Sequence, residues 1–170
     1  LLKEQDRLRK FGHEVPSNLR IGTMLEVPAL VWQLDRLLPQ LDFLSIGTND
    51  LMQFFFASDR GNPMTGDRYD ILSLPSLRLL SHVREMCEKY EVPVSLCGEL
   101  GGRPLEAMTL LGLGFRSFSL PSATVGPVKR MVRSANYERL KTAVGDALAS
   151  SSEDLRGQLK AIADAQGVKL

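Results

Sequence analysis

The chain has 170 residues, of which 21 are Lys or Arg, 20 are Asp or Glu and 2 are Cys. This length suffices for one domain with its own core, and a formal net charge of +1 argues against a basic surface for nucleic acid or for an anionic membrane. No apolar run approaches the roughly 20 residues of a membrane span, and the two cysteines form neither a disulfide framework nor a CxxC pair, so a reduced, cytoplasmic protein is expected.

Hydrophobic spacing and breaker residues divide the chain into alternating strands and helices. Residues 1–11 are highly charged and contain no helix breaker, which predicts a first helix. Strands are predicted at 19–26, 41–47, 92–97 and 115–120, and helices at 29–38, 51–56, 75–90, 104–113 and 127–132. Two amphipathic helices, 135–149 and 152–166, follow, and Ser151 with Asp154 gives the second a start like a capping box.

This alternation predicts an α/β fold with a parallel sheet. Four βα units form either a small open sheet or half of an eight-stranded barrel, because a complete barrel needs about 250 residues. In a half-barrel, two strand edges are unpaired and the side chains facing the interior, such as Leu44 and Leu96 or their alternating neighbours, lose their cover. Such a chain is expected to self-associate.

The stretch LDFLSIGTNDL at 41–51 contains the most informative pattern. An apolar run breaks at Gly47 into three polar residues, and a helical pattern follows. This is the layout of a strand-to-helix junction, and α/β folds bind ligands outside the carboxyl ends of their strands. Asp50 is therefore either the N-cap of a helix or a carboxylate that binds a metal ion or a cationic group.

Reactive side chains end three of the predicted strands: Glu26, the pair Asn49 and Asp50, and Cys97. Parallel strands bring these ends to one edge of the sheet. Two carboxylates there suit Mg²⁺, which proteins hold with one or two carboxylates plus substrate oxygens. The alternative is that Glu26 and Asp50 are separate polar groups with their own partners. Cys97, by itself, has the character of a small core residue.

Other candidates lie away from the strand ends. Cys87 falls on the apolar side of the 75–90 helix, which indicates core packing. Arg60 lies in the Gly- and Pro-rich loop 57–70, where it either contacts an anion bound at the metal or is a solvated loop residue. His13 and His82 are expected to be surface or satisfied residues.

Four motifs occur in order: GTMLEVPA at 22–29, DFLSIGTNDLMQ at 42–53, SDRGN at 58–62 and SLCGELGG at 95–102. Together they resemble the C-terminal phosphoenolpyruvate (PEP)-binding barrel of the PEP-protein phosphotransferases, the enzymes I of the bacterial phosphotransferase system. The LEVP sequence is similar to that of the nitrogen-related paralogue. Pyruvate phosphate dikinase, PEP synthase, a Mg-dependent lyase of the same barrel type and a non-catalytic dimerisation module are the alternatives.

The resemblance implies that residues 1–133 are the C-terminal half of a (β/α)8 TIM-type barrel and that residues 134–170 are a helical tail packed on it. It implies a transferase that passes the phosphoryl group of PEP to an enzyme histidine and then to a phosphocarrier protein, releasing pyruvate. It also implies a cytoplasmic homodimer. The phosphoacceptor histidine and further substrate arginines of the family lie outside the matching motifs, so this chain alone is expected to be inactive.

Residue by residue, the resemblance assigns Mg²⁺ binding to Glu26 and Asp50. It assigns substrate binding to Asn49, Asp50 and Arg60, with the PEP phosphate contacted by Asn49 and Arg60. It makes Cys97 the donor of a proton to the methylene carbon of enolpyruvate. A thiol, with an ordinary pKa of about 8.5, can serve as a general acid near neutral pH.

Overall fold

The computed structural model describes residues 2–59, 61–62, 64–65, 70–150 and 152–170. Four parallel strands form one sheet in chain order: β1 (Gly22–Leu25), β2 (Phe43–Gly47), β3 (Val94–Cys97) and β4 (Phe118–Ser119). The predicted α/β class with a parallel sheet is thereby confirmed. No helix in the described ranges is both long and apolar enough to cross a membrane.

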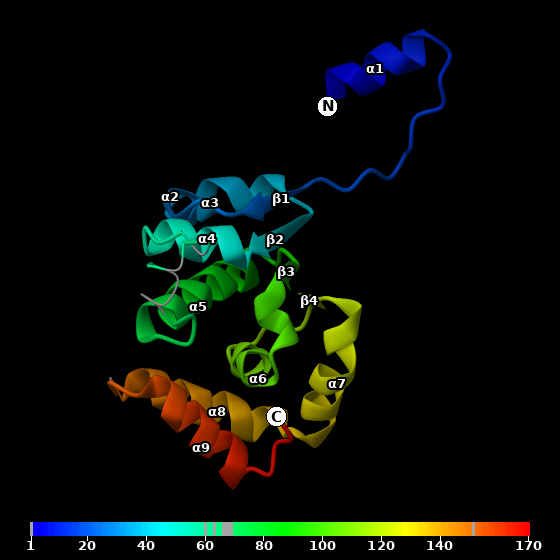
Figure 1. The fold of residues 1–170 in the computed structure, drawn as a ribbon. Helices are drawn as coiled ribbons and strands as arrows, with labels where there is room; N and C mark the ends of the chain where they lie inside the picture. The colour runs from blue at the N-terminus through cyan, green and yellow to red at the C-terminus, as the bar shows by residue number, and fades with distance from the viewer. Residues whose placement is uncertain (1, 60, 63, 66–69, 151) are drawn as a thin grey trace.

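Helices connect the strands and continue after them (Figure 1). Before and between the strands lie α1 (Leu2–Lys10), α2 (Pro28–Val31), α3 (Leu34–Leu37), α4 (Thr48–Phe55), α5 (Leu74–Lys89) and α6 (Pro104–Gly112), and after β4 lie α7 (Val125–Ser134), α8 (Tyr137–Ala149) and α9 (Leu155–Ala165). Short 3-10 helices are η1 (Leu38–Gln40), η3 (Glu99–Gly102) and η4 (Ser122–Thr124). Figure 1 shows α1 set apart from the other elements at the end of an extended segment.

The register of the sheet decides which side chains the helices cover. Leu25 pairs with Ile46, and Ile46 pairs with Leu96, so these three side chains lie on one face. They and Leu44 are almost completely buried. Leu44 and Leu96 therefore pack under the helices, and it is their alternating neighbours that line the other face. That face carries Met24, Phe43, Ser45, Ser95 and Cys97, all of them at least partly exposed.

The prediction of one continuous helix at 29–38 is wrong. This segment forms two separate helices, α2 and α3, and η1 follows them. The chain leaves helical geometry at Trp32 and Gln33, where ψ is 2° and 10°. Trp32 is 76% exposed, and its ring lies 5.7 Å from the ring of His82. Pro39 lies inside η1, where the first turn of a helix tolerates a residue without an N–H.

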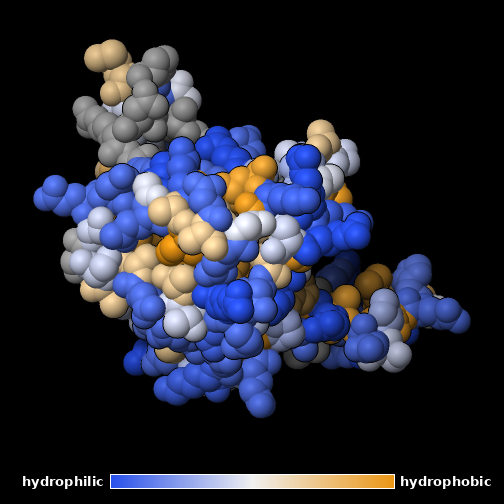
Figure 2. All heavy atoms as spheres, turned by 90° about the horizontal axis from the view of Figure 1, so that it is seen from below, coloured by the Kyte–Doolittle hydropathy of each residue, from blue (hydrophilic) through white to orange (hydrophobic). Residues whose placement is uncertain are grey.

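The two predicted tail helices are present, as α8 and α9. Each has a side-chain cap, because Asn136 accepts a hydrogen bond from the N–H of Arg139 and Asp154 accepts one from the N–H of Gly157. The expected capping box of Ser151 with Asp154 is therefore wrong, because Asp154 is itself the N-cap residue of a helix that begins at Leu155. Ser151 lies outside the described residues. Figure 2 views the molecule from below, the side on which α8 and α9 lie in Figure 1, and the surface there is mostly hydrophilic with small apolar areas. Their apolar sides therefore face inward.

The tail packs on the sheet domain through α6, which contacts both α8 and α9. A Cβ atom at Gly112 of α6 would lie 2.7 Å from Cγ2 of Val144, so a glycine is needed for this close approach. Leu140, Val144 and Leu159 are completely buried. The tail thus extends the core instead of lying loosely on its surface.

Candidate functional site

Polar side chains gather at the carboxyl edge of the sheet. Glu26 directly follows β1, Asn49 and Asp50 open the helix that follows β2, and Cys97 is the last residue of β3. Gly47, the last residue of β2, pairs with Cys97. The structure therefore places four of the five predicted site residues at this edge, while their roles stay predictions.

Gly47 makes room for the side chain of Glu26. A Cβ atom at position 47 would lie 2.6 Å from Cγ and 2.8 Å from Oε1 of Glu26, closer than any real contact. The carboxylate thus lies across the end of β2, in the space that a larger residue would fill. Glu26 itself is half-buried, so water or a ligand can reach it.

Asp50 lies in the first turn of α4, because this helix begins at Thr48 and not at Leu51 as the pattern predicts. Gly47 is the N-cap residue, so the interpretation of Asp50 as an N-cap is wrong. A carboxylate in the first turn still interacts favourably with the positive end of the helix dipole. Asp50 is half-buried, so its carboxylate combines this helix-stabilising position with partial exposure to solvent.

Thr48 joins α4 to the end of β3. Its side chain is buried, and Oγ1 donates a hydrogen bond of 3.0 Å to the carbonyl oxygen of Cys97. Gly98 follows with a φ of +128°, and a Cβ there would lie 2.6 Å from Thr48 Oγ1 and 3.3 Å from Asn49 Oδ1. The amide side chain of Asn49 is therefore held beside the cysteine-bearing strand.

The sequence pattern did not single out Thr48, since one threonine between a glycine and an asparagine is an ordinary junction residue. Its partner is a backbone carbonyl 49 residues further along the chain. Such a bond becomes visible only when the register of β2 and β3 is known. The adjacent Gly98, whose positive φ favours glycine, was the available signal of a tight approach.

The two cysteines occupy different surroundings. Cys87 is buried on α5, and burial raises the pKa of its thiol to about 11. Cys97 is only half-buried, on the face of the sheet that the helices leave open. Its sulfur donates a hydrogen bond to the carbonyl oxygen of Ile46 at 3.3 Å and accepts one from the hydroxyl of Ser45 at 3.5 Å. Cys97 is therefore not a buried apolar residue.

Arg60 lies outside the described residues, but the residues on either side of it show how the loop is folded. Oδ1 of Asp59 accepts a hydrogen bond of 2.8 Å from the N–H of Gly61. The buried hydroxyl of Ser58 donates to the carbonyl oxygen of Thr65. The described residues on either side of Arg60 are thus joined by local hydrogen bonds.

The donor set at the sheet edge suits a hard cation with few protein ligands. Within the described ranges, no three His, Cys, Asp or Glu side chains form a group that could hold a metal. Glu26 and Asp50 provide two carboxylates, and Mg²⁺ commonly takes its other oxygens from substrate and water. Gly47, without a side chain, leaves the space at the end of β2 that the Glu26 carboxylate occupies.

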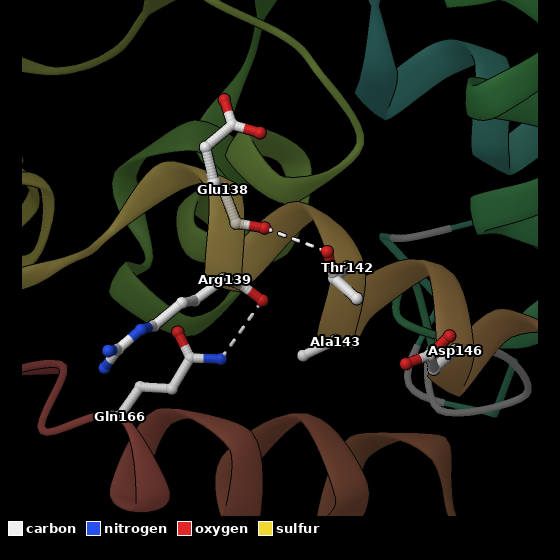
Figure 3. Close-up of a pocket in the computed structure, with 6 residues that line it drawn as sticks. All are labelled: Glu138, Arg139, Thr142, Ala143, Asp146 and Gln166. Carbon is white, nitrogen blue, oxygen red and sulfur yellow. Dashed lines mark hydrogen bonds between the residues drawn. The ribbon is translucent and has the colours of Figure 1, made fainter.

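The pocket in Figure 3 lies far from this chemistry. It has a volume of about 470 Å³ and is lined by α8 and the end of α9. Thr142 donates to the carbonyl of Glu138, and Gln166 donates to the carbonyl of Arg139, so the pocket's polar groups bind its own helices. Its mixed charges favour no ligand class.

Comparisons with known proteins support one family. The profile described as PEP-utilising enzyme, PEP-binding domain, matches residues 1–137. A protein of Salmonella typhimurium named phosphoenolpyruvate-dependent phosphotransferase system is 37% identical over 159 residues, which is 93% of this chain and 21% of that protein. Phosphoenolpyruvate-protein phosphotransferases of Cupriavidus necator and Borreliella burgdorferi are 36% and 38% identical over 87% and 86% of this chain. The chain spans about a fifth to a quarter of the length of these relatives.

Proposed function

Because the chain belongs to the PEP-utilising enzymes, through their PEP-binding domain, we propose that it is the C-terminal PEP-binding part of a PEP-protein phosphotransferase. The complete enzyme would transfer the phosphoryl group of PEP to one of its histidines and then to a phosphocarrier protein, releasing pyruvate. The observation that carries this proposal is the convergence of Glu26, Asn49 and Cys97 around Gly47, at the carboxyl edge of a parallel sheet.

We assign residues 1–133 to the C-terminal half of a (β/α)8 barrel and residues 134–170 to a helical tail. Supporting this, β1 and β4 are the outer strands of the sheet, and one of its faces is covered by helices while the other is partly exposed. Four more βα units would pair with these edges and cover Met24 and Phe43, which are 48% and 38% exposed. A homodimer in the cytoplasm belongs to the same proposal.

Glu26 and Asp50 would hold the Mg²⁺ ion. When bound, this ion would neutralise charge on the phosphoryl group and orient the substrate. In support of this, the side chain of Glu26 lies over Gly47, which has no side chain, and Asp50 stands in the first turn of α4. The two carboxylates follow neighbouring parallel strands, one directly after β1 and one in the first turn of the helix after β2.

Asn49, Asp50 and Arg60 would bind the substrate, with Asn49 and Arg60 at the phosphate. Asn49 is held beside Gly98, and the amide N–H groups that open α4 carry the positive end of its dipole, which favours an anion. Arg60 would add a guanidinium matched to phosphate geometry. These groups act by position and charge, which is what phosphoryl transfer chiefly requires.

Cys97 would donate a proton to the methylene carbon of enolpyruvate. Its thiol is half-buried on the open face, where a substrate at the strand ends can approach it. The positive φ of Gly98 turns the backbone away directly after this residue, so the strand ends at the thiol.

The experiment that tests this function is phosphorylation of the full-length protein by PEP. Asp50→Ala should abolish Mg²⁺-dependent phosphorylation while the variant remains folded. Asp35→Ala is the matched control, because Asp35 is an exposed carboxylate on α3 and its loss should leave the rate unchanged. Normal phosphorylation of Asp50→Ala would show that the strand-end carboxylates do not form the metal site.

A further inference from the structure

We propose that Ser45 is a positioning residue for Cys97, which holds the thiol on the open face of the sheet and stabilises the thiolate left after proton transfer. This inference rests on the proposed function and adds a residue to it. Ser45 lies in the middle of β2, and its hydroxyl is 3.5 Å from Sγ of Cys97, within the range of hydrogen bonds to sulfur.

The sheet register fixes this contact. Ser45 pairs with Ser95, and Gly47 pairs with Cys97, so Ser45 is the diagonal neighbour of the cysteine on the same face. Gly47, directly opposite Cys97, has no side chain that could reach the sulfur. The hydroxyl two residues earlier on β2 therefore reaches across to it.

The two hydrogen bonds of the sulfur have opposite effects on its proton. The carbonyl oxygen of Ile46, 3.3 Å from Sγ, accepts the S–H and favours the thiol. The Ser45 hydroxyl donates to the sulfur, and this bond strengthens when the sulfur becomes an anion. The Ile46 carbonyl thus holds the thiol proton before the reaction, and the Ser45 hydroxyl stabilises the thiolate that forms when this proton leaves.

The proton step balances with these groups alone. The S–H bond of Cys97 breaks and leaves its electron pair on sulfur, while the enolate double bond supplies the pair for a new C–H bond at the methylene carbon. The enolate oxygen becomes the ketone oxygen of pyruvate. Cys97 is then a thiolate, and a proton from solvent restores the thiol.

The surroundings make a neutral donor useful here. Among the described residues, the charged side chains that follow the strands at this edge of the sheet are Glu26 after β1, Asp50 in α4, Glu99 in η3 and Arg103 after η3. Most of these are carboxylates, so few positive charges at this edge could balance a thiolate. The neutral Ser45 hydroxyl from β2 can stabilise the thiolate by a hydrogen bond, and it adds no charge to the site.

The first test follows alkylation of Cys97 by iodoacetamide in this chain, across pH, by peptide mass mapping. Ser45→Ala should shift the labelling profile to higher pH and slow labelling at pH 8 by several-fold, because the thiolate loses a donor. Ser45→Thr should keep the wild-type profile, and Ser45→Val, of similar shape without the hydroxyl, should behave like Ser45→Ala. Ser95→Ala is the control on the paired strand. An unchanged profile in Ser45→Ala and Ser45→Val would overturn the proposal.

The second test measures pyruvate formation by the full-length protein. Ser45→Ala should lower kcat about tenfold, the effect of one hydrogen bond to a charged group, with KM for PEP nearly unchanged. Ser45→Thr should restore kcat. If kcat of Ser45→Ala equals that of the wild type, Ser45 has no part in the proton step. If Cys97→Ala keeps full turnover, the catalytic role of the cysteine fails, and the alkylation profile still decides whether Ser45 controls the thiol.

Discussion

Replacing Arg156 with methionine should destabilise the chain by about 3 kcal/mol. Nε of Arg156 donates to one carboxylate oxygen of Asp70 at 2.5 Å, and Nη2 donates to the other at 2.7 Å. Nη2 also donates to Glu106 on α6 at 2.8 Å. This one guanidinium therefore joins α9 to α6 and to the end of the loop that contains the SDRGN segment.

The magnitude follows from burial. The side chain of Glu106 is only 4% exposed, so loss of Arg156 leaves a buried carboxylate without its cation, which costs about 3–5 kcal/mol. The lower end applies because Arg156 is 35% exposed and Asp70 is 39% exposed, so water can partly replace the lost contacts. For a domain of this size, about 3 kcal/mol lowers the midpoint of thermal unfolding by about 6–12 °C.

Urea and thermal unfolding followed by circular dichroism provide the assay. Arg9→Met is the control, because Arg9 pairs at 2.9 Å with Asp6 on α1 and both side chains are more than half exposed. Loss of that pair should cost at most about 1 kcal/mol. An Arg156→Met variant as stable as the wild type, or no less stable than Arg9→Met, would refute the reasoning from burial.

The effect should also depend on pH. The hydrogen bonds from Arg156 are the main cause that lowers the pKa of Asp70, against a smaller opposing effect of burial. A carboxyl with a lowered pKa in the folded state contributes stability above its unfolded pKa, and that stability is lost as the pH falls through the folded value. The stability difference between wild type and Arg156→Met should therefore shrink as the pH falls below about 4. A difference that grows on acidification would contradict this linkage.

Two further predictions concern the cysteines and the open sheet. Cys87→Ala should lower the free energy of unfolding by about 1 kcal/mol through lost packing, whereas Cys97→Ala in the full-length enzyme should slow pyruvate formation far more than it lowers stability, as denaturation and product assays can show. In sedimentation, the chain should self-associate through its unpaired strand edges and bind PEP weakly, and a clean monomer with tight, Mg²⁺-dependent binding would contradict the half-barrel proposal.

The order of the elements, and the meeting of the candidate site residues at one edge of the sheet, could be predicted from the sequence. Alternating apolar runs and breaker residues indicate βα units, since strands and helices need different hydrophobic periods. Parallel strands place their carboxyl ends together, so Glu26, Asn49 and Cys97 were expected at one edge from chain order alone. The family motifs add their proposed roles, which stem from the resemblance and not from spacing.

Only the tertiary structure decided which face each strand residue occupies. A period of two shows that Leu44 and Ser45 face opposite ways, but not which one the helices cover, and the observed register buries Leu44. The split between α2 and α3 was equally hidden, because local apolar spacing does not reveal that the chain leaves helical geometry at Trp32 and Gln33.

The contacts at the candidate site and between the tail and the rest of the chain join residues far apart in sequence. Ser45 reaches Cys97 across 52 residues, Thr48 reaches the same residue across 49, and Arg156 reaches Asp70 across 86. Each contact needs the sheet register or the packing of α9 on α6 before its two partners can meet. Local patterns along the chain determine the elements and the ends of the strands, whereas hydrogen bonds between distant residues exist only once the elements have packed.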